Sequence, residues 1–191
     1  MLLYIHGFNS SPDSFKANVL KGAMTRLGRV GEFLCPALPH RPAQAMALLE
    51  SSVPKHNLDQ LTIVGSSLGG FYATYLTQKY GMRCVLLNPA IYPHDGLRAY
   101  LGKQKNLYTG EEYDLTEQYL NEMRALFVPT LNALDRYLLI TATGDEVLDY
   151  RDGVERYVGA EQIIIQGSDH GMSDFAGYLD KILLYARVSS L

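Results

Sequence analysis

The stretch 63–69 constrains the fold of this chain more than any other part of the sequence. It reads Gly-x-Ser-x-Gly at Gly65, Ser67 and Gly69, and the short β-branched run 60–64 leads into it. Behind the motif, apolar side chains recur at helical spacing at Phe71, Tyr75 and Leu76. This order predicts a strained strand-to-helix corner that holds the Ser67 hydroxyl out of the edge of a sheet. The alternative is a packing turn of a Rossmann-like domain, where small residues only permit close approach.

Other strand-like and helix-like segments alternate along the chain. Further apolar runs typical of buried strands lie at 2–5, 32–36, 83–89, 137–140 and 163–165. Helical patterns lie between them, over 11–27, 42–53 and 70–80, and again after residue 173. We expect the first helix to begin with Ser11 as N-cap and Pro12 behind it, and to bury Phe15, Val19 and Ala23. The alternation predicts a three-layer α/β fold, with a mainly parallel sheet of about six strands and helices on both faces.

The segment 91–127 interrupts this alternation. It is rich in tyrosine and acidic residues, and its apolar stripe at helical spacing consists of Leu115, Tyr119, Met123 and Leu126. Asp114 and Glu117 have the spacing of a capping box at the start of that helix. We expect this segment to be a small cap inserted in a single domain that spans residues 1–191. Its tyrosines would either pack the cap against the body or face a ligand.

Composition and charge disfavour several classes of protein. A net charge of −3 without a basic block argues against nucleic acid as a partner. No run approaches the roughly 20 apolar residues of a membrane span, and a strand directly after Met1 predicts no secretory signal. Cys35 and Cys84 lie in apolar runs without metal-ligand spacing, which predicts buried free thiols in a reducing compartment. We therefore expect a cytoplasmic protein, and no motif indicates a metal or another cofactor.

A serine hydroxyl needs a base within hydrogen-bond distance before it acts as a nucleophile near neutral pH. His170 is the best candidate, because it lies in a polar, glycine-flanked loop past the strand 163–165. Functional groups of an open parallel sheet gather at the carboxyl ends of its strands, where His170 would reach Ser67. The alternative is a solvent-exposed loop histidine. His40 and His56 lie beside prolines and helix ends, where we expect surface positions.

The imidazole in turn needs a carboxylate that fixes its tautomer and stabilises its charged form. Asp145 follows the strand 137–140 in Thr-Gly-Asp and is the best-placed acid, although the same residues would suit an Asx turn. Asp149 and Asp169 stay as alternatives, the first in the following turn and the second next to His170. The chain order serine, aspartate, histidine is that of the α/β-hydrolases and differs from that of other serine-triad folds.

Acyl transfer also needs donors for the oxyanion that develops on the substrate. The backbone N–H of Leu68, directly after Ser67, is one expected donor. Gly7 follows the first strand and allows its loop to approach, so we expect the N–H of Phe8 to be the second. We expect His6 to orient this loop by hydrogen bonds rather than to act as a base. The alternative interpretation of His6 is a buried histidine that only packs under the loop.

Five blocks of the sequence form a combination more specific than any one of them, at 6–12, 65–70, 88–90, 106–110 and 143–151. Together, and over essentially the whole chain, they resemble the YqiA-type bacterial esterases of the α/β-hydrolase superfamily. The resemblance implies a minimal hydrolase sheet without the first two antiparallel strands. It also implies serine esterase activity on carboxylic esters, with acyl-CoA thioesters as a further class, and Ser67, Asp145 and His170 in the triad positions. The chain departs from the pattern at Gly171-Met172, where a small and then an aromatic residue are expected.

Two functions of different classes follow from these patterns. The first is a serine esterase that hydrolyses a small-molecule ester or thioester through an acyl-enzyme. The second is a module on the same scaffold that binds a ligand or a protein without turnover. The sequence leaves the substrate, the acyl chain length and the oligomeric state open.

Overall fold

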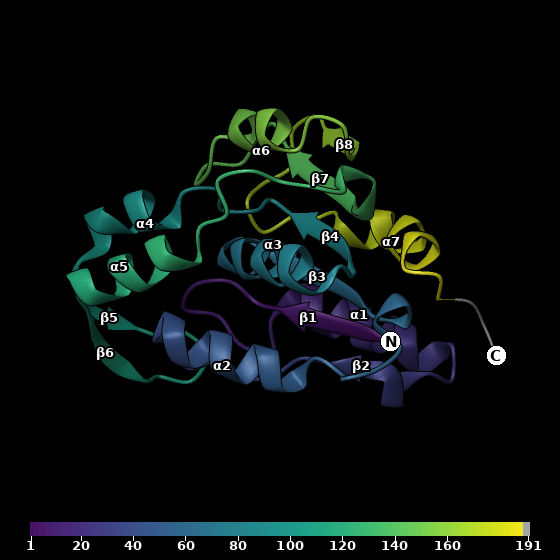
Figure 1. Cartoon of the computed structure of the whole chain (residues 1–191), viewed down its shortest axis with the longest axis horizontal. Coiled ribbons are helices and arrows are strands. Elements are labelled where there is room, and N and C mark those ends of the chain that lie inside the picture. Colours follow the sequence, from purple (N-terminus) through teal and green to yellow (C-terminus); the bar gives the residue numbers. More distant parts are fainter. Residues whose placement is uncertain (189–191) are drawn as a thin grey trace.

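The computed structural model describes residues 1–188, and a six-stranded sheet forms its centre (Figure 1). The strands are ordered β2-β1-β3-β4-β7-β8, and every neighbouring pair is parallel. Their bounds are β1 Leu2–Ile5, β2 Phe33–Leu34, β3 Thr62–Ser66, β4 Arg83–Leu87, β7 Tyr137–Ala142 and β8 Glu161–Ile165. The order makes β3 and β4 central, and both are buried almost throughout because apolar layers cover their two faces.

Helices cover both faces of the sheet. Their bounds are α1 Phe15–Arg26, α2 Pro42–Ser52, α3 Leu68–Tyr80, α6 Tyr150–Arg156 and α7 Leu179–Tyr185. Side chains alternate along β1, so that Leu3 and Ile5 pack with α2 and α3, while Leu2 and Tyr4 pack with α1 and α7. Single 3₁₀ turns cover Val30–Glu32, Leu58–Gln60, Leu97–Tyr100, Leu134–Arg136 and Phe175–Tyr178. The predicted three-layer α/β fold is therefore confirmed.

The register of the central strands brings their carboxyl ends together. Ser66 of β3 pairs with Leu87 of β4, and Leu87 pairs with Ile140 of β7. The residues that directly follow these three strands consequently lie at one edge of the sheet. This is the edge where the sequence predicts the functional groups.

Residues 91–127 form a group of short elements beside the sheet (Figure 1). They are α4 Pro93–Gly96, the antiparallel hairpin β5 Gly102–Lys105 and β6 Glu112–Leu115, and α5 Glu117–Leu126. The sequence does not predict the hairpin, because its strands are polar and mostly exposed and show no apolar alternation. The expected capping box is wrong: Asp114 lies in β6, and Thr116 is the N-cap of α5 without a side-chain hydrogen bond.

The expected start of the first helix is also wrong. α1 begins at Phe15 after the N-cap Ser14, and the hydroxyl of Ser11 accepts a hydrogen bond from the Asp13 N–H in a preceding turn. Phe15 is 50% exposed. Ala23 is buried as expected and Val19 is partly buried, and the rest of the buried face of α1 consists of Ala17, Leu20 and Met24. A serine turn and a helix N-cap use the same residue types, so the local sequence does not choose between them.

Three smaller features complete the fold. Asp149, expected in a turn, is the N-cap of α6 and accepts a hydrogen bond from the Arg151 N–H. Cys84 is buried as expected, whereas Cys35 is only partly buried, and both are free thiols. Within the described residues 1–188, no helix has both the length and the apolar character needed to cross a membrane.

Candidate active site

Ser67 occupies the corner between β3 and α3. Its backbone has φ 54° and ψ −124°, in the positive-φ region that L-residues rarely adopt. Such a conformation costs on the order of 1–3 kcal/mol and persists only where surrounding contacts hold it. Here the N–H of Ser67 donates to Leu87 O at 3.0 Å, and its carbonyl accepts from the N–H groups of Gly70 at 2.8 Å and Ala90 at 3.0 Å. The corner is therefore fixed to β4 and to the residues that follow it.

Gly65 and Gly69 allow the strand and the helix to meet at this corner. A Cβ atom on Gly65 would lie 2.5 Å from the Gly69 carbonyl oxygen and 2.7 Å from the Cβ of Ala73. A Cβ atom on Gly69 would lie 2.7 Å from the His6 carbonyl oxygen. All three distances are shorter than real Cβ contacts, so close packing rather than a special dihedral angle requires glycine at these two positions.

His170 and Asp145 form a continuous chain of hydrogen bonds with Ser67. Nε2 of His170 lies 3.1 Å from the Ser67 Oγ, and Nδ1 of His170 lies 2.8 Å from Oδ2 of Asp145. The three residues come from loops that follow β3, β7 and β8. A carboxylate can only accept a hydrogen bond, so the neutral imidazole of His170 carries its proton on Nδ1, toward Asp145. Its Nε2 is then an acceptor for the Ser67 hydroxyl.

The environment of Asp145 favours its charged form. Its carboxylate is 2% exposed, and its Oδ1 accepts hydrogen bonds from the N–H groups of Val147 and Leu148, both at 2.8 Å. Burial raises the pKa of Asp145, but the hydrogen bonds from His170, Leu148 and Val147 outweigh burial and lower that pKa below its usual value. Asp145 is therefore an anion near neutral pH and keeps the imidazole oriented.

The two alternative acids have other partners. Asp149 forms an ion pair with the Arg151 guanidinium at 2.6 Å. Oδ1 of Asp169 accepts a hydrogen bond from the Ser173 N–H at 2.8 Å. Within residues 1–188, Asp145 is the carboxylate that bonds the imidazole of His170.

The first loop lies directly against Ser67. A Cβ atom on Gly7 would come within 3.1 Å of the Ser67 Cβ and 3.3 Å of the Ser66 carbonyl oxygen, so glycine lets the loop come this close without crowding. Among residues 1–188, the backbone N–H groups of Phe8 and Leu68 donate to no other protein group. Phe8, Leu68, Ser67 and His170 line the same cleft. Two free N–H donors therefore belong to residues beside the Ser67 hydroxyl.

His6 is buried beneath this loop, with 4% of its surface exposed. Its Nε2 accepts a hydrogen bond from the Leu38 N–H at 3.2 Å, and its Nδ1 lies 3.1 Å from the Gly7 carbonyl oxygen. Burial lowers the pKa of His6, which favours the neutral ring with its proton on Nδ1. Both ring nitrogens are thus occupied by the backbone, which leaves His6 no free nitrogen for Ser67.

A cleft of about 580 Å³ opens at Ser67, within the size range of small-molecule sites. One wall consists of residues from the segment after β4, and the other follows Asp145 into α6. The apolar lining residues include Phe8, Ile91, Leu97, Tyr100, Val147 and Leu148. Its charged lining residues are Asp95, Asp149 and Asp152, and no lysine or arginine of residues 1–188 lines it. The cleft can hold an uncharged apolar chain next to the Ser67 hydroxyl.

The hairpin of the segment 91–127 is bonded to the loop after β1. Asn9 accepts a hydrogen bond from the Tyr113 hydroxyl at 2.7 Å and donates one to Oε1 of Gln104 at 3.3 Å. Asn106 donates to the Ser10 carbonyl oxygen at 3.0 Å. Tyr113 is also stacked on His40, which is partly buried rather than a simple surface residue. The hairpin therefore braces the loop that carries Phe8.

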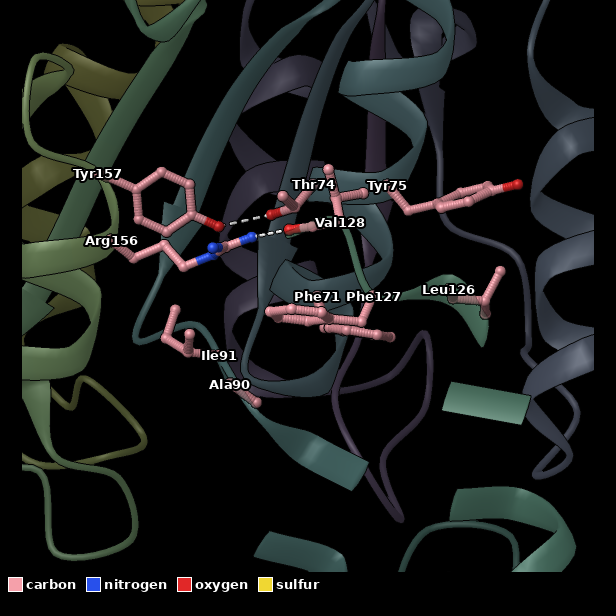
Figure 2. A pocket seen from close by; sticks show the side chains of 10 residues that line it. All are labelled: Phe71, Thr74, Tyr75, Ala90, Ile91, Leu126, Phe127, Val128, Arg156 and Tyr157. Carbon is pink, nitrogen blue, oxygen red and sulfur yellow. Dashed lines mark hydrogen bonds between the residues drawn. The ribbon is translucent and has the colours of Figure 1, made fainter. Parts of the chain in front are cut away.

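A second, smaller hollow lies where this segment returns to the body (Figure 2). The guanidinium of Arg156 donates to the carbonyl oxygens of Val128 and Pro129 and lies 4.9 Å from the centre of the Phe127 ring. Tyr157 and Thr74 share a hydrogen bond of 2.6 Å behind it. Figure 2 shows Arg156 directed at the Val128 carbonyl and the Tyr157 hydroxyl directed at Thr74, so these contacts join the end of α6 to the chain that leaves the segment and to α3.

Sequence reasoning missed the residues that surround the His170 loop. Asn88 belongs to an Asn-Pro step after β4, which marks the end of a strand but gives no sign that its side chain bonds a distant loop. Lys16 lies on α1, and no sequence pattern around it indicates a contact with the His170 loop. Glu146 accepts a hydrogen bond from the His170 N–H at 3.0 Å.

Within residues 1–188, no three His, Cys, Asp or Glu side chains are grouped so that they could hold a metal ion.

Comparison with known proteins gives a family match and a fold match. The model of an uncharacterised protein family, UPF0227, matches residues 1–187. The UPF0227 protein YE1706 of Yersinia enterocolitica is 24% identical over 187 residues, which are 95% of this chain and 96% of the relative. A UPF0227 protein of Yersinia pseudotuberculosis has the same identity and coverage.

Several solved structures with similar folds are described as hydrolases or esterases. A putative hydrolase from Agrobacterium vitis S4 has a TM-score of 0.72 at 16% identity and covers 97% of this chain and 87% of its own. Est1E from Butyrivibrio proteoclasticus has a TM-score of 0.68 at 14% identity, with 98% and 88% covered. At these identities the likeness shows the fold, which is that of the α/β-hydrolases.

Proposed function

The chain belongs to the uncharacterised protein family UPF0227, and from its own residues we propose that it is a serine esterase. The single observation that carries the proposal is the hydrogen-bond chain from Ser67 through His170 to Asp145, with distances of 3.1 Å and 2.8 Å. A hydroxyl, an imidazole and a buried carboxylate in this order form the general arrangement for nucleophilic acyl transfer.

The proposed reaction has two halves. Oγ of Ser67 attacks the ester carbonyl while Nε2 of His170 takes the hydroxyl proton, and the N–H groups of Phe8 and Leu68 stabilise the oxyanion. The protonated imidazole then gives its proton to the leaving alcohol or thiol, which departs from the acyl-enzyme. In the second half, His170 deprotonates a water molecule that attacks the acyl carbonyl, and Ser67 regains its proton as the acid leaves. Asp145 holds the imidazole in place throughout.

The cleft supports a small-molecule substrate with an apolar portion. Its lining is largely aliphatic and aromatic and starts at Ser67. We propose that residues 91–127 act as a small cap over this cleft within one domain. Oxygen esters and thioesters pass through the same kind of tetrahedral intermediate, so the choice between them requires measurement. Comparing p-nitrophenyl esters of increasing chain length with the matching acyl-CoAs would make that choice.

Covalent labelling tests the proposed function directly. A fluorophosphonate probe reacts with a serine that a neighbouring base activates, so we expect stoichiometric labelling and a mass-spectrometric adduct on Ser67. Prior denaturation should abolish the labelling, because the chain of hydrogen bonds then disappears. A folded protein that neither labels nor turns over any member of an ester panel would contradict the proposal.

Replacing Asp145 with asparagine should lower kcat by about 10⁴-fold, because the amide favours the wrong imidazole tautomer and no longer stabilises its charge. Asp169→Asn is the matched control, since an amide oxygen can still accept the hydrogen bond from the Ser173 N–H. Its kcat should stay within about five-fold of the wild-type value, as for a substitution outside the reacting groups. Steady-state rates of both variants decide which aspartate serves His170, and an equal loss in both would contradict the assignment to Asp145.

Replacing Tyr113 with phenylalanine should loosen the loop that carries Phe8. The variant loses the hydroxyl that donates to Asn9 but keeps the ring stacked on His40. Because a small displacement of an oxyanion donor affects only the transition state, we expect kcat to fall by about ten-fold with little change in KM. Tyr108→Phe on the same hairpin is the control, because its exposed hydroxyl bonds no other group of residues 1–188. Equal kinetics of the two variants would argue against this coupling.

A further inference from the structure

Side chains from elsewhere in the fold hold three consecutive carbonyl groups of the loop that carries His170. Nδ2 of Asn88 donates to the carbonyl oxygens of Asp169 at 3.1 Å and His170 at 3.2 Å. Nζ of Lys16 donates to the carbonyl oxygen of Gly171 at 2.7 Å. Each residue of the loop from 169 to 171 therefore accepts a hydrogen bond at its carbonyl oxygen from a distant side chain.

The loop has no regular secondary structure, and its local hydrogen bonds are those of a turn, from the N–H groups of Met172 at 3.0 Å and Ser173 at 2.8 Å to Asp169. It belongs to neither a helix nor a strand, and Gly167, Ser168 and Met172 on its two sides have positive φ angles of 76°, 60° and 53°. A backbone with such kinks gains no regular hydrogen-bond ladder. Contacts from outside the loop therefore add to this turn in fixing the direction of the imidazole.

Asn88 is built to provide such a contact. It directly follows β4, is 2% exposed and has φ 40°. Its Oδ1 accepts hydrogen bonds from the Ala142 N–H at 2.8 Å and from the Thr141 hydroxyl at 3.3 Å. A backbone N–H can only donate, which fixes the amide with its Nδ2 toward the loop. One side chain thus joins the end of β7, which leads to Asp145, to the residue that bears the imidazole.

Lys16, on α1, forms a hydrogen bond with the other end of the loop, at Gly171. Burial lowers the pKa of its ammonium group to about 8, against the charges of Asp169 and Asp145, which raise it. A partly buried amine needs a hydrogen-bond acceptor, and the Gly171 carbonyl oxygen supplies one. The contact crosses 155 positions of the sequence.

We propose that Asn88 and Lys16 are positioning residues, which hold the loop 169–171 so that the His170 imidazole stands between Asp145 and Ser67. The consequence for catalysis rests on the proposed esterase function, whereas the consequence for the imidazole does not. Since a misplacement of about 1 Å can cost about 100-fold in rate, the hold on this loop sets a large part of kcat.

Asn88→Asp is the sharpest test, because it keeps Oδ1 and the shape of the side chain but replaces two donors with an acceptor that faces two carbonyl oxygens. We expect kcat to fall by about 100-fold, with KM changed by less than about three-fold. Thr141→Val is the matched control: it removes only the 3.3 Å contact on the far side of the amide, and its kinetics should match the wild type. Lys16→Met should lose about ten-fold in kcat, and Lys16→Arg should recover most of it, because a guanidinium still donates to the Gly171 carbonyl.

The ring-nitrogen chemical shifts of His170 in isotope-labelled protein provide a readout that needs no turnover. Wild type and Thr141→Val should show the single tautomer with the proton on Nδ1, and Asn88→Asp should show a mixture. An unchanged tautomer and unchanged kcat in a folded Asn88→Asp variant would overturn the proposal. If Asn88→Asp does not fold, the same two measurements on Lys16→Met test the proposal. The amine of Lys16 projects from α1, so its removal should leave the core intact. If Asn88→Asp changes the ring-nitrogen shifts of His170 while the wild-type protein hydrolyses no ester, the positioning role is upheld and the proposed function is refuted.

Discussion

Replacing Ser67 with alanine is expected to lower kcat/KM for a p-nitrophenyl ester by about 10⁶-fold, to the level that the remaining donors and binding contacts provide. The substitution removes the only atom that forms the acyl bond in the proposed reaction, while His170 and Asp145 keep their 2.8 Å contact. The same variant should lose fluorophosphonate labelling. Its free energy of unfolding should stay close to wild type, because alanine adopts the same strained corner without adding atoms.

Ser66→Ala is the matched control for this result. Ser66 is the neighbouring residue of the same motif, but it is buried in β3, and its side chain lies near the phenol of Tyr4. Its loss should leave kcat within about five-fold of wild type, as for other substitutions outside the reacting groups. A Ser67→Ala variant that keeps a substantial part of the activity would mean that another residue is the nucleophile. It would also remove the main support for the esterase proposal.

Replacing Gly69 with alanine should destabilise the protein by more than about 3 kcal/mol, because a methyl group there overlaps backbone that side-chain rearrangement cannot move. The added Cβ would lie 2.6 Å from the Ile5 carbonyl carbon and 2.7 Å from the His6 carbonyl oxygen. To relieve this overlap α3 must move away from β1, and that motion would displace Leu68 and the loop at Gly7. We therefore expect loss of activity together with loss of stability, measured by urea denaturation and ester turnover.

Gly177→Ala provides the comparison, since a Cβ atom at Gly177 meets nothing within 4 Å. It should change the free energy of unfolding by less than about 0.5 kcal/mol, which is usual for an open surface position. If Gly69→Ala instead unfolds at the wild-type urea concentration, the close packing at the corner is not needed. The strained Ser67 would then have to be explained by other contacts.

Local patterns predicted the fold well where one segment carries all the information. The strand-to-helix corner at Ser67, the helix that begins at Pro42 and the end of α3 at Gly81 all follow from their own residues. The prediction failed where two local structures use the same residue types, as at Ser11, or where strands are polar, as in the β5–β6 hairpin. In those places the contacts with distant parts of the chain make the choice.

The candidate site divides in the same way. Sequence reasoning selected Ser67, Asp145 and His170 from their loops and their order, and the three side chains lie within hydrogen-bond distance of one another in turn. It could not find Asn88 or Lys16, because their contacts join positions 81 to 155 residues apart. Nothing in the neighbourhood of either residue marks such a partner.

The sequence by itself determined that a serine stands at a strained corner after a central strand, since glycine, serine and β-branched residues impose that geometry over a few positions. Only the tertiary structure decided which groups hold the imidazole loop and which hairpin braces the loop of Phe8. The physical reason is that a dihedral preference acts within a few residues, whereas a hydrogen bond between loops exists only after the parallel strands have brought their ends to one edge.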